Sequence, residues 1–216
     1  MGALSLYRIW NYVPHINAPE DGLETYRRFS RARSLELEAH FGKGFAAHLP
    51  AASAVGAISG SLAIAFVAGP AKPKRFENPR QVPAYAYPSE HGPRPPSFCR
   101  ALRVTVGAED VIFVSGTAAI RGHASIATAN FATQLTYTVE NLEAIAHEAG
   151  AGHGIGSTGG WRRRFTVYLR HPADLAAART LLAGTFRSAD HVSFVQADVC
   201  RSELLIEIEC TLRRAR

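Results

Sequence analysis

Apolar and polar positions follow regular patterns through the second half of the chain. The stretches CRALRVTV and DVIFVSGTAAI, joined by a short turn, predict two strands, and RRFTVYLRHP, HVSFVQADV and ELLIEIECTL predict three more. Apolar residues recur at helical spacing over about 131–150 and again over 174–186. The order β-β-α-β-α-β-β over 97–216 predicts an α+β domain in which two helices cover one mixed sheet.

The first half of the chain predicts fewer elements. LYRIWNYVPHIN indicates a strand, residues 23–41 a helix, and AASAVGAISGSLAIAFVAG a small-residue loop followed by a buried strand. The helix directs its arginines outward and an apolar face inward, and that face consists of Leu23, Tyr26, Phe29 and Leu37. Residues 1–71 therefore predict a partial β-α-β unit.

Prolines dominate the segment 72–96, KPKRFENPRQVPAYAYPSEHGPRPP. Because proline lacks an N–H group and fixes φ, the segment is predicted to be a linker of loop and extended chain, with neither a helix nor a central strand. Tyr85 and Tyr87 alternate with alanine and project to one side if the chain is extended, and Arg94 follows them. These side chains either pack as an interdomain strap or meet at a ligand.

Composition narrows the classes of protein. The chain has 216 residues, 47% of them hydrophobic, and its longest apolar stretch, 61–69, is too short to span a bilayer, so we expect a soluble cytoplasmic protein. Three cysteines without paired spacing and nine histidines without HxH or HExxH spacing predict neither disulfides nor a metal site. The net charge of +6 comes from arginine, and it indicates a solvated surface or anionic small ligands rather than nucleic acid.

The stretch QADVCRSELLIEIE holds the clearest candidate chemistry, because it places Cys200 seven residues before Glu207. Side chains alternate along a strand, so Glu207 and Glu209 share one face while Ile206 and Ile208 share the other. A carboxylate set among leucine and isoleucine must be solvated, paired or used. Glutamates exposed on an edge strand and a functional acid are both compatible with this pattern.

Small residues mark two further places. Gly116, between Ser115 and Thr117, lets another group approach the backbone of its strand closely. The segment 150–160, GAGHGIGSTGG, lacks the GxGxxG spacing of a dinucleotide site and is predicted to be a mobile loop.

Several stretches together resemble the chorismatase branch of the RidA/YjgF-like (chorismate-mutase-like) fold. The matching stretches are YRIWNYVPHIN, GLETYRRF, LPAASAVG, ENPRQVPAYAYP, GPRPPSF, VSGTAAIRGH, VYLRHPADL and QADVCRSELLIEIE. The resemblance implies small α+β units that trimerise, with active sites at subunit interfaces, and an enzyme of secondary metabolism that acts on chorismate without a cofactor or metal. Its acid falls on Glu207, which would protonate the enolpyruvyl methylene group.

The resemblance also implies a product. Its aromatising members carry a cysteine and a glycine where this chain has Cys200 and Gly116, so the implied reaction converts chorismate to 3-hydroxybenzoate and pyruvate. Arg94, Arg170, Tyr85 and Tyr87 are the implied substrate-binding residues. A chorismate hydrolase that releases a dihydroxycyclohexadiene carboxylate, a RidA-type enamine/imine deaminase and a non-catalytic ligand-binding protein remain as alternatives.

Two positions depart from the family pattern. The chorismatases of this resemblance have a further stretch before YRIWNYVP, whereas this chain begins almost at that strand. We therefore expect a shortened N-terminal unit with an exposed edge that either pairs with another chain or destabilises the unit, and the activity of the chain is in question for that reason. His91 stands where the pattern has a second tyrosine.

Overall fold

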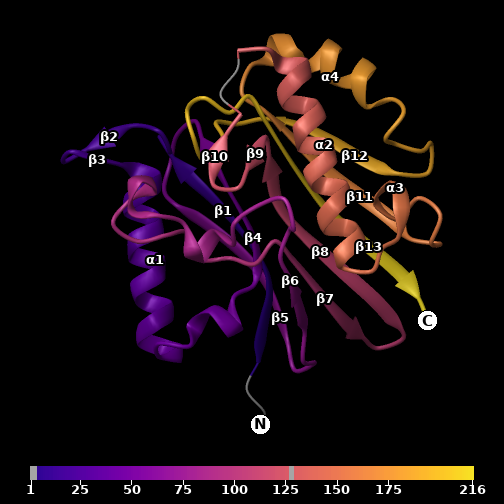
Figure 1. Cartoon of the computed structure of the whole chain (residues 1–216), viewed down its shortest axis with the longest axis horizontal. Coiled ribbons are helices and arrows are strands. Elements are labelled where there is room, and N and C mark those ends of the chain that lie inside the picture. Colours follow the sequence, from indigo (N-terminus) through magenta and orange to yellow (C-terminus); the bar gives the residue numbers. More distant parts are fainter. Residues whose placement is uncertain (1–3, 127–128) are drawn as a thin grey trace.

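The computed structural model describes residues 4–126 and 129–216 and is built on a six-stranded mixed sheet (Figure 1). Its strand order is β12-β11-β13-β8-β7-β6, and all neighbours are antiparallel except β11 and β12. The strands are β6 (Lys74–Phe76), β7 (Ala101–Val106), β8 (Glu109–Ala118), β11 (Arg162–Leu169), β12 (His191–Gln196) and β13 (Ile206–Ala215).

Two helices, α2 (Phe131–Glu148) and α4 (Leu175–Leu182), cover one face of this sheet (Figure 1). The side chain of Asn130 accepts a hydrogen bond from the Thr133 amide and caps α2. The apolar core lies between α2 and the strands, and it includes Leu142 and Ile208, both fully buried. The predicted α+β class and element order are confirmed, although α4 ends at Leu182, before the predicted Phe186.

The opposite face of the large sheet meets a smaller sheet of order β4-β1-β5. It is formed by β1 (Ser5–Pro14), β4 (Ala51–Ala57) and β5 (Ala63–Gly69). The central strand β1 pairs parallel with β4 and antiparallel with β5. From β1, the side chains of Arg8 and Trp10 reach Glu209 on β13, which joins the two sheets.

The prediction of a loop and one buried strand over 51–69 was wrong. Both β4 and β5 are strands, and β5 is the exposed one, with Ile64 53% and Phe66 63% exposed. An edge strand pairs along one side only, and apolar residues there do not by themselves produce burial. The sheet of the N-terminal unit therefore has three strands, where the predicted β-α-β fragment had two.

The helix α1 (Thr25–Phe41) follows the short strands β2 (Pro19–Glu20) and β3 (Leu23–Glu24). Gly42, with φ +74°, ends it. Of the predicted apolar face, Tyr26 and Phe29 point inward and line the cavity, but the buried residues of α1 are Ser30 and Ser34. The helix covers a polar cavity, so its inner face is mixed and not purely apolar.

The proline-rich segment 72–96 contributes the edge strand β6 and two short 3-10 helices, η2 (Ala84–Ala86) and η3 (Ser89–His91). The remaining small elements are η1 (Phe45–His48), β9 (Ile120–Arg121), β10 (Ala124–Ser125), α3 (His153–Gly156) and η4 (Pro172–Asp174). Within the described residues, no helix is both long and apolar enough to cross a membrane.

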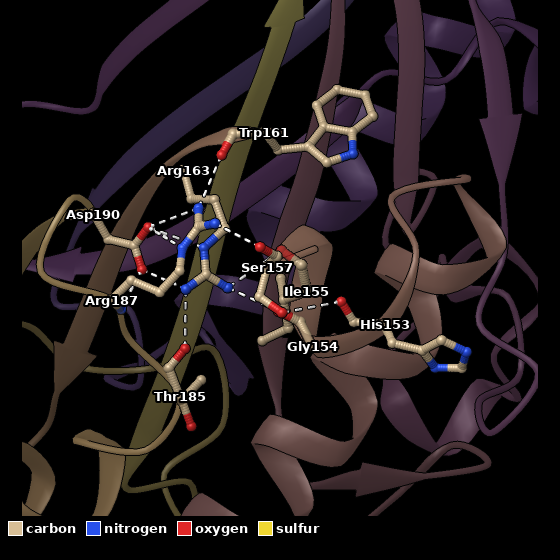
Figure 2. Close-up of polar contacts among 9 residues, drawn as sticks. All are labelled: His153, Gly154, Ile155, Ser157, Trp161, Arg163, Thr185, Arg187 and Asp190. Atoms are coloured by element: carbon tan, nitrogen blue, oxygen red, sulfur yellow. Dashed lines mark hydrogen bonds and ion pairs between the residues drawn. The ribbon is translucent and has the colours of Figure 1, made fainter. Parts of the chain in front are cut away.

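The glycine-rich segment contains α3 and is fastened by two arginines (Figure 2). The buried Arg163 forms an ion pair with the buried Asp190 and donates a 2.8 Å hydrogen bond to the carbonyl of Gly154. Arg187 donates to the carbonyls of Ser157, at 2.6 Å, and of Trp161. This part of the arginine excess thus holds a loop in place, contrary to its assignment to solvated surface or ligand binding.

Candidate active site

A cavity of about 400 Å³ lies between α1 and the polar face of the large sheet. Its wall includes Gly116 of β8, Glu207 of β13, Cys200 of the β12–β13 connection and Tyr26 of α1. The volume lies within the range of small-molecule sites, about 300–1,000 Å³. Glu207 and Cys200, predicted to act together, therefore open into one cavity.

Glu207 is the acid in this cavity. Its side chain points away from the apolar core, yet the residue is only 4% exposed. Burial, with the nearby Glu209 carboxylate, raises the pKa of Glu207 to about 8, while Arg8 and Arg100 act in the opposite direction. Oε1 of Glu207 has no hydrogen-bond partner within the described chain. Glu207 is therefore predominantly a neutral carboxylic acid at pH 7 and can donate a proton.

The neighbouring carboxylate, Glu209, has a different environment. Arg8, only 1% exposed, places Nη2 2.5 Å from Oε2 of Glu209. Ser53 Oγ donates to the same oxygen at 2.5 Å, and Trp10 Nε1 donates to Oε1 at 2.9 Å. Two glutamates on one strand face thus divide into a paired carboxylate and an unpaired acid.

The backbone of β8 makes room for the acid. The β8–β13 pairing shifts register between Ile208 and Cys210, opposite the segment that contains Gly116. A Cβ atom on Gly116 would lie 1.9 Å from Oε1 of Glu207 and 3.0 Å from Oγ of Ser53. The amide of Gly116 donates to Ser53 Oγ at 3.0 Å. A glycine is therefore required for this position of the Glu207 carboxyl group.

Cys200 lies at the wall of the cavity as a free thiol. Burial and the Glu207 carboxylate raise its pKa to about 12, which keeps it protonated at neutral pH. Burial, Cys200 and Glu207 together raise the pKa of the Tyr26 phenol well above its usual value. A protonated thiol is a poor nucleophile, so this setting favours a proton relay for Cys200.

The other predicted site residues divide between two places. Tyr87 is buried, lines the cavity, and its hydroxyl accepts a 2.7 Å hydrogen bond from Arg100. Tyr85 lies outside the lining, and burial followed by the charge of Glu77 raises its pKa. Arg94 also lies outside and forms a 2.5 Å ion pair with Glu38 of α1.

Arg170, the remaining predicted residue, holds the connection that carries Cys200. It donates to the carbonyls of Leu204 at 2.7 Å and Arg201 at 2.9 Å, and forms a 2.6 Å ion pair with Asp198. The structure therefore places Arg170 behind the cavity wall, where it positions the loop.

Four arginines that line the cavity were not among the predicted site residues: Arg27, Arg33, Arg100 and Arg201. Arg33 was expected to face outward from α1, but it donates a 2.9 Å hydrogen bond to the Asn11 side chain. Burial lowers the pKa of Arg33 to about 10, which leaves it a cation at neutral pH. Arg100, in the PSFCRA stretch, follows Arg94 in the sequence and was a further candidate to meet a ligand with the tyrosines, but it was not assigned to the site.

The fold and the cavity define the class of protein: an α+β protein in which a buried carboxylic acid faces an arginine-lined pocket. Residues 1–68 match the family model described as chorismatase FkbO/Hyg5-like, N-terminal. The chain is 35% identical over 96% of its length to a 3-hydroxybenzoate synthase of Streptomyces hygroscopicus, and 37% identical over 97% to a chorismatase of Streptomyces rapamycinicus.

A crystal structure of a chorismatase superposes with a TM-score of 0.85, at 32% identity over 96% of this chain. By sequence and by fold, the chain is therefore similar to chorismatases, in line with the resemblance. The present chain covers only part of the length of these proteins: 63% of the chorismatase in the crystal structure, 63% of the 3-hydroxybenzoate synthase and 64% of the second chorismatase.

Proposed function

We propose that this protein is a chorismatase that converts chorismate to 3-hydroxybenzoate and pyruvate. The observation that carries the proposal is Glu207, a buried and unpaired carboxyl group, with a pKa raised to about 8, in the wall of the cavity. A carboxylic acid that is still protonated near neutrality is suited to donate a proton to carbon. The relatives named 3-hydroxybenzoate synthase and chorismatase support the choice of substrate.

In the proposed reaction, Glu207 donates its proton to the methylene carbon of the enolpyruvyl group. The neighbouring ring hydroxyl attacks the resulting cationic ether carbon and loses its proton, and the bond between that carbon and the original ether oxygen breaks, so that oxygen takes up a proton and stays on the ring. The bond from the ring to the attacking oxygen then breaks as pyruvate leaves with that oxygen, and the ring carbon that carries the retained hydroxyl loses its proton to give 3-hydroxybenzoate. Chorismate has the same atoms as 3-hydroxybenzoate plus pyruvate, so aromatisation needs no oxidant and no net water. Release of a dihydroxycyclohexadiene acid would consume one water molecule.

The arginines of the cavity match the two carboxylates of chorismate. Arg33, Arg100 and Arg201 present guanidinium groups, which bind carboxylates through paired N–H donors. Arg100 is further fixed by its hydrogen bond to Tyr87. In this proposal these three arginines and Tyr87 bind substrate, while Arg94, Arg170 and Tyr85 support the wall from outside.

Two residues are proposed to direct the product. Gly116 leaves the space that the Glu207 carboxyl occupies, and Cys200, a thiol on the same cavity, relays a proton as the ring becomes aromatic.

The proposed setting is the cytoplasm, and the proposed assembly is a homotrimer. Free thiols at Cys99, Cys200 and Cys210 support a reducing compartment. The exposed edge strand β5, with Ile64 and Phe66, supports pairing with another copy. Size-exclusion chromatography with light-scattering detection measures the molar mass and so gives the number of subunits.

The test is incubation with chorismate, separation of the products by chromatography and enzymatic assay of pyruvate. We expect equal amounts of 3-hydroxybenzoate and pyruvate from the wild type. Glu207→Gln should reduce turnover about 1,000-fold, because general acids contribute about 10²–10⁴-fold. The matched control is Glu140→Gln, which removes a surface carboxylate paired with Arg80 and should leave turnover unchanged.

Two outcomes would contradict the proposal. A dihydroxycyclohexadiene acid as the main product would assign the protein as a chorismate hydrolase. Unchanged turnover in a folded Glu207→Gln variant would remove the proposed acid.

A further inference from the structure

Three ligand atoms from distant parts of the sequence meet beside the active-site cavity. Nε2 of His91 lies 3.0 Å from Nδ1 of His123, and Oε1 of Glu90 lies 3.3 Å from each of these nitrogens. The sequence predicts no metal site, because the two histidines are 32 residues apart. We propose that Glu90, His91 and His123 bind a divalent transition-metal ion, with zinc as the ion to test first.

The three separations fit a single cation. With metal–ligand bonds of about 2.1 Å, neighbouring ligands stand about 3.0 Å apart at right angles and about 3.4 Å apart at the tetrahedral angle. The observed 3.0, 3.3 and 3.3 Å span this interval. Two imidazole nitrogens and one carboxylate oxygen are also a donor set that zinc and iron(II) accept.

Backbone hydrogen bonds hold both ligand-bearing segments. His91 and Glu90 belong to η3, where the amide of His91 donates to the carbonyl of Pro88 at 3.1 Å. His123 lies at the tip of the β9–β10 hairpin. The neighbouring Gly122 amide donates a 2.9 Å hydrogen bond to the backbone carbonyl of Arg80. The hairpin is also held at the His123 carbonyl, which accepts a 2.9 Å hydrogen bond from Arg201. The ligand atoms are therefore held close together by the fold itself.

The positive charges of Arg201 and Arg27 lie near His91. Each guanidinium group also contacts oxygen atoms of neighbouring residues. Arg201 donates to the His123 carbonyl and to Ser125 Oγ, both at 2.9 Å, and Arg27 lies 3.4 Å from Glu24. The carboxylate of Glu90, 3.3 Å from both histidine nitrogens, supplies the negative charge that favours a divalent cation beside these guanidinium groups.

The site faces the cavity. Glu90 and His91 are part of its wall, and the His91 ring packs at 5.1 Å against Tyr87, which is also in the wall. Three protein ligands leave at least one coordination position open. That position would accept water or an anionic oxygen donor, such as a carboxylate, from a molecule in the cavity.

Zinc binding is measured directly, without an activity assay. Chelator-treated full-length protein is titrated with zinc against a fluorescent competitor, and bound zinc is counted by mass spectrometry after dialysis. We expect one equivalent with a Kd of about 1 µM or tighter. His123→Ala and Glu90→Gln should each weaken binding at least about 100-fold, since even the groups around the ligands contribute about 10–100-fold.

Two controls separate this site from other zinc-binding groups. His147 and His153 form a second pair, with ring centroids 5.1 Å apart, and His153→Ala should leave the affinity unchanged. Cys200→Ser should also leave it unchanged, which excludes binding by the thiol. Circular dichroism confirms the fold of each variant, and the exposed Glu90 provides a substitution outside the core.

The proposal is overturned if the wild type binds less than about half an equivalent at about 10 µM free zinc. It is also overturned if folded His123→Ala and Glu90→Gln bind as tightly as the wild type. A loss of binding in His153→Ala or Cys200→Ser alone would place the metal elsewhere and equally contradict the assignment.

Discussion

The two faces of the large sheet are both buried, and the same strand, β13, supplies opposite chemistry to them. Ile206 and Ile208 contact the apolar core under α2, whereas Glu207 and Glu209 point toward β1, β4 and the cavity. Apolar burial contributes to folding directly. Burial of carboxyl groups opposes folding unless a partner compensates for it, so the second face is where the fold retains reactivity.

The largest expected effect comes from breaking the buried ion pair between Arg8 and Glu209 on the polar face of the large sheet. Arg8→Met should lower the free energy of unfolding by about 4 kcal/mol, because Glu209 is left as a buried charge without its guanidinium. Chemical denaturation measures the change. The double variant Arg8→Met/Glu209→Leu should recover most of the loss, and a double variant as unstable as the single one would show that the charge pair is not the cause.

A core substitution on the apolar face should act on stability alone. Leu142→Ala, at a fully buried position of α2, should lower the free energy of unfolding by about 3 kcal/mol through the cavity it leaves. Its turnover per folded molecule should equal that of the wild type. A large drop in turnover at a temperature where the variant is folded would mean that the two faces are more closely coupled than their contacts indicate.

Gly116→Ala should act mainly on the polar face. The added Cβ would occupy the position of Glu207 Oε1, so the carboxyl must move away from its present place. We expect turnover to fall about 100-fold, consistent with the sensitivity of catalysis to displacements of about 1 Å. Steady-state kinetics measures the effect, and Ala119→Gly, at a buried neighbour outside the cavity lining, is the matched control.

The smallest effect is a pH dependence of stability. The pKa of Glu207 is about 8 in the folded protein, against 4.5 for an ordinary glutamate, so the folded state binds the proton more tightly. The stability that this tighter proton binding contributes is fully present below pH 4.5 and is lost as the pH rises through 8. Between pH 5 and pH 7 the wild type should lose about 2 kcal/mol relative to Glu207→Gln. Parallel stability curves for the two proteins would contradict this.

The sequence predicted the elements of the second half because their periodicity is strong and local. Alternation along β13 also predicted that Glu207 and Glu209 share a face. It could not predict that Arg8, 201 residues away from Glu209, supplies the partner, because that contact depends on how the small sheet packs on the large one.

The positions of the arginine side chains could not be predicted from the sequence. The pattern of α1 directed Arg33 outward, since a charged residue on an amphipathic helix normally faces solvent. The inner face of α1 borders a polar cavity, so Arg33 lines it, while Arg94 pairs with Glu38 outside. The pair His91 and His123 was missed for a similar reason, because only the packing of η3 beside the β9–β10 hairpin brings the rings together.

The central claim is that Glu207 is a protonated acid at neutral pH, and infrared spectroscopy of its carboxyl group tests this most directly. The difference spectrum between the wild type and Glu207→Gln at pH 7 should contain the C=O band of a protonated carboxylic acid. That band should disappear with a midpoint near pH 8. A carboxylate signal for Glu207 at pH 6 would contradict the account.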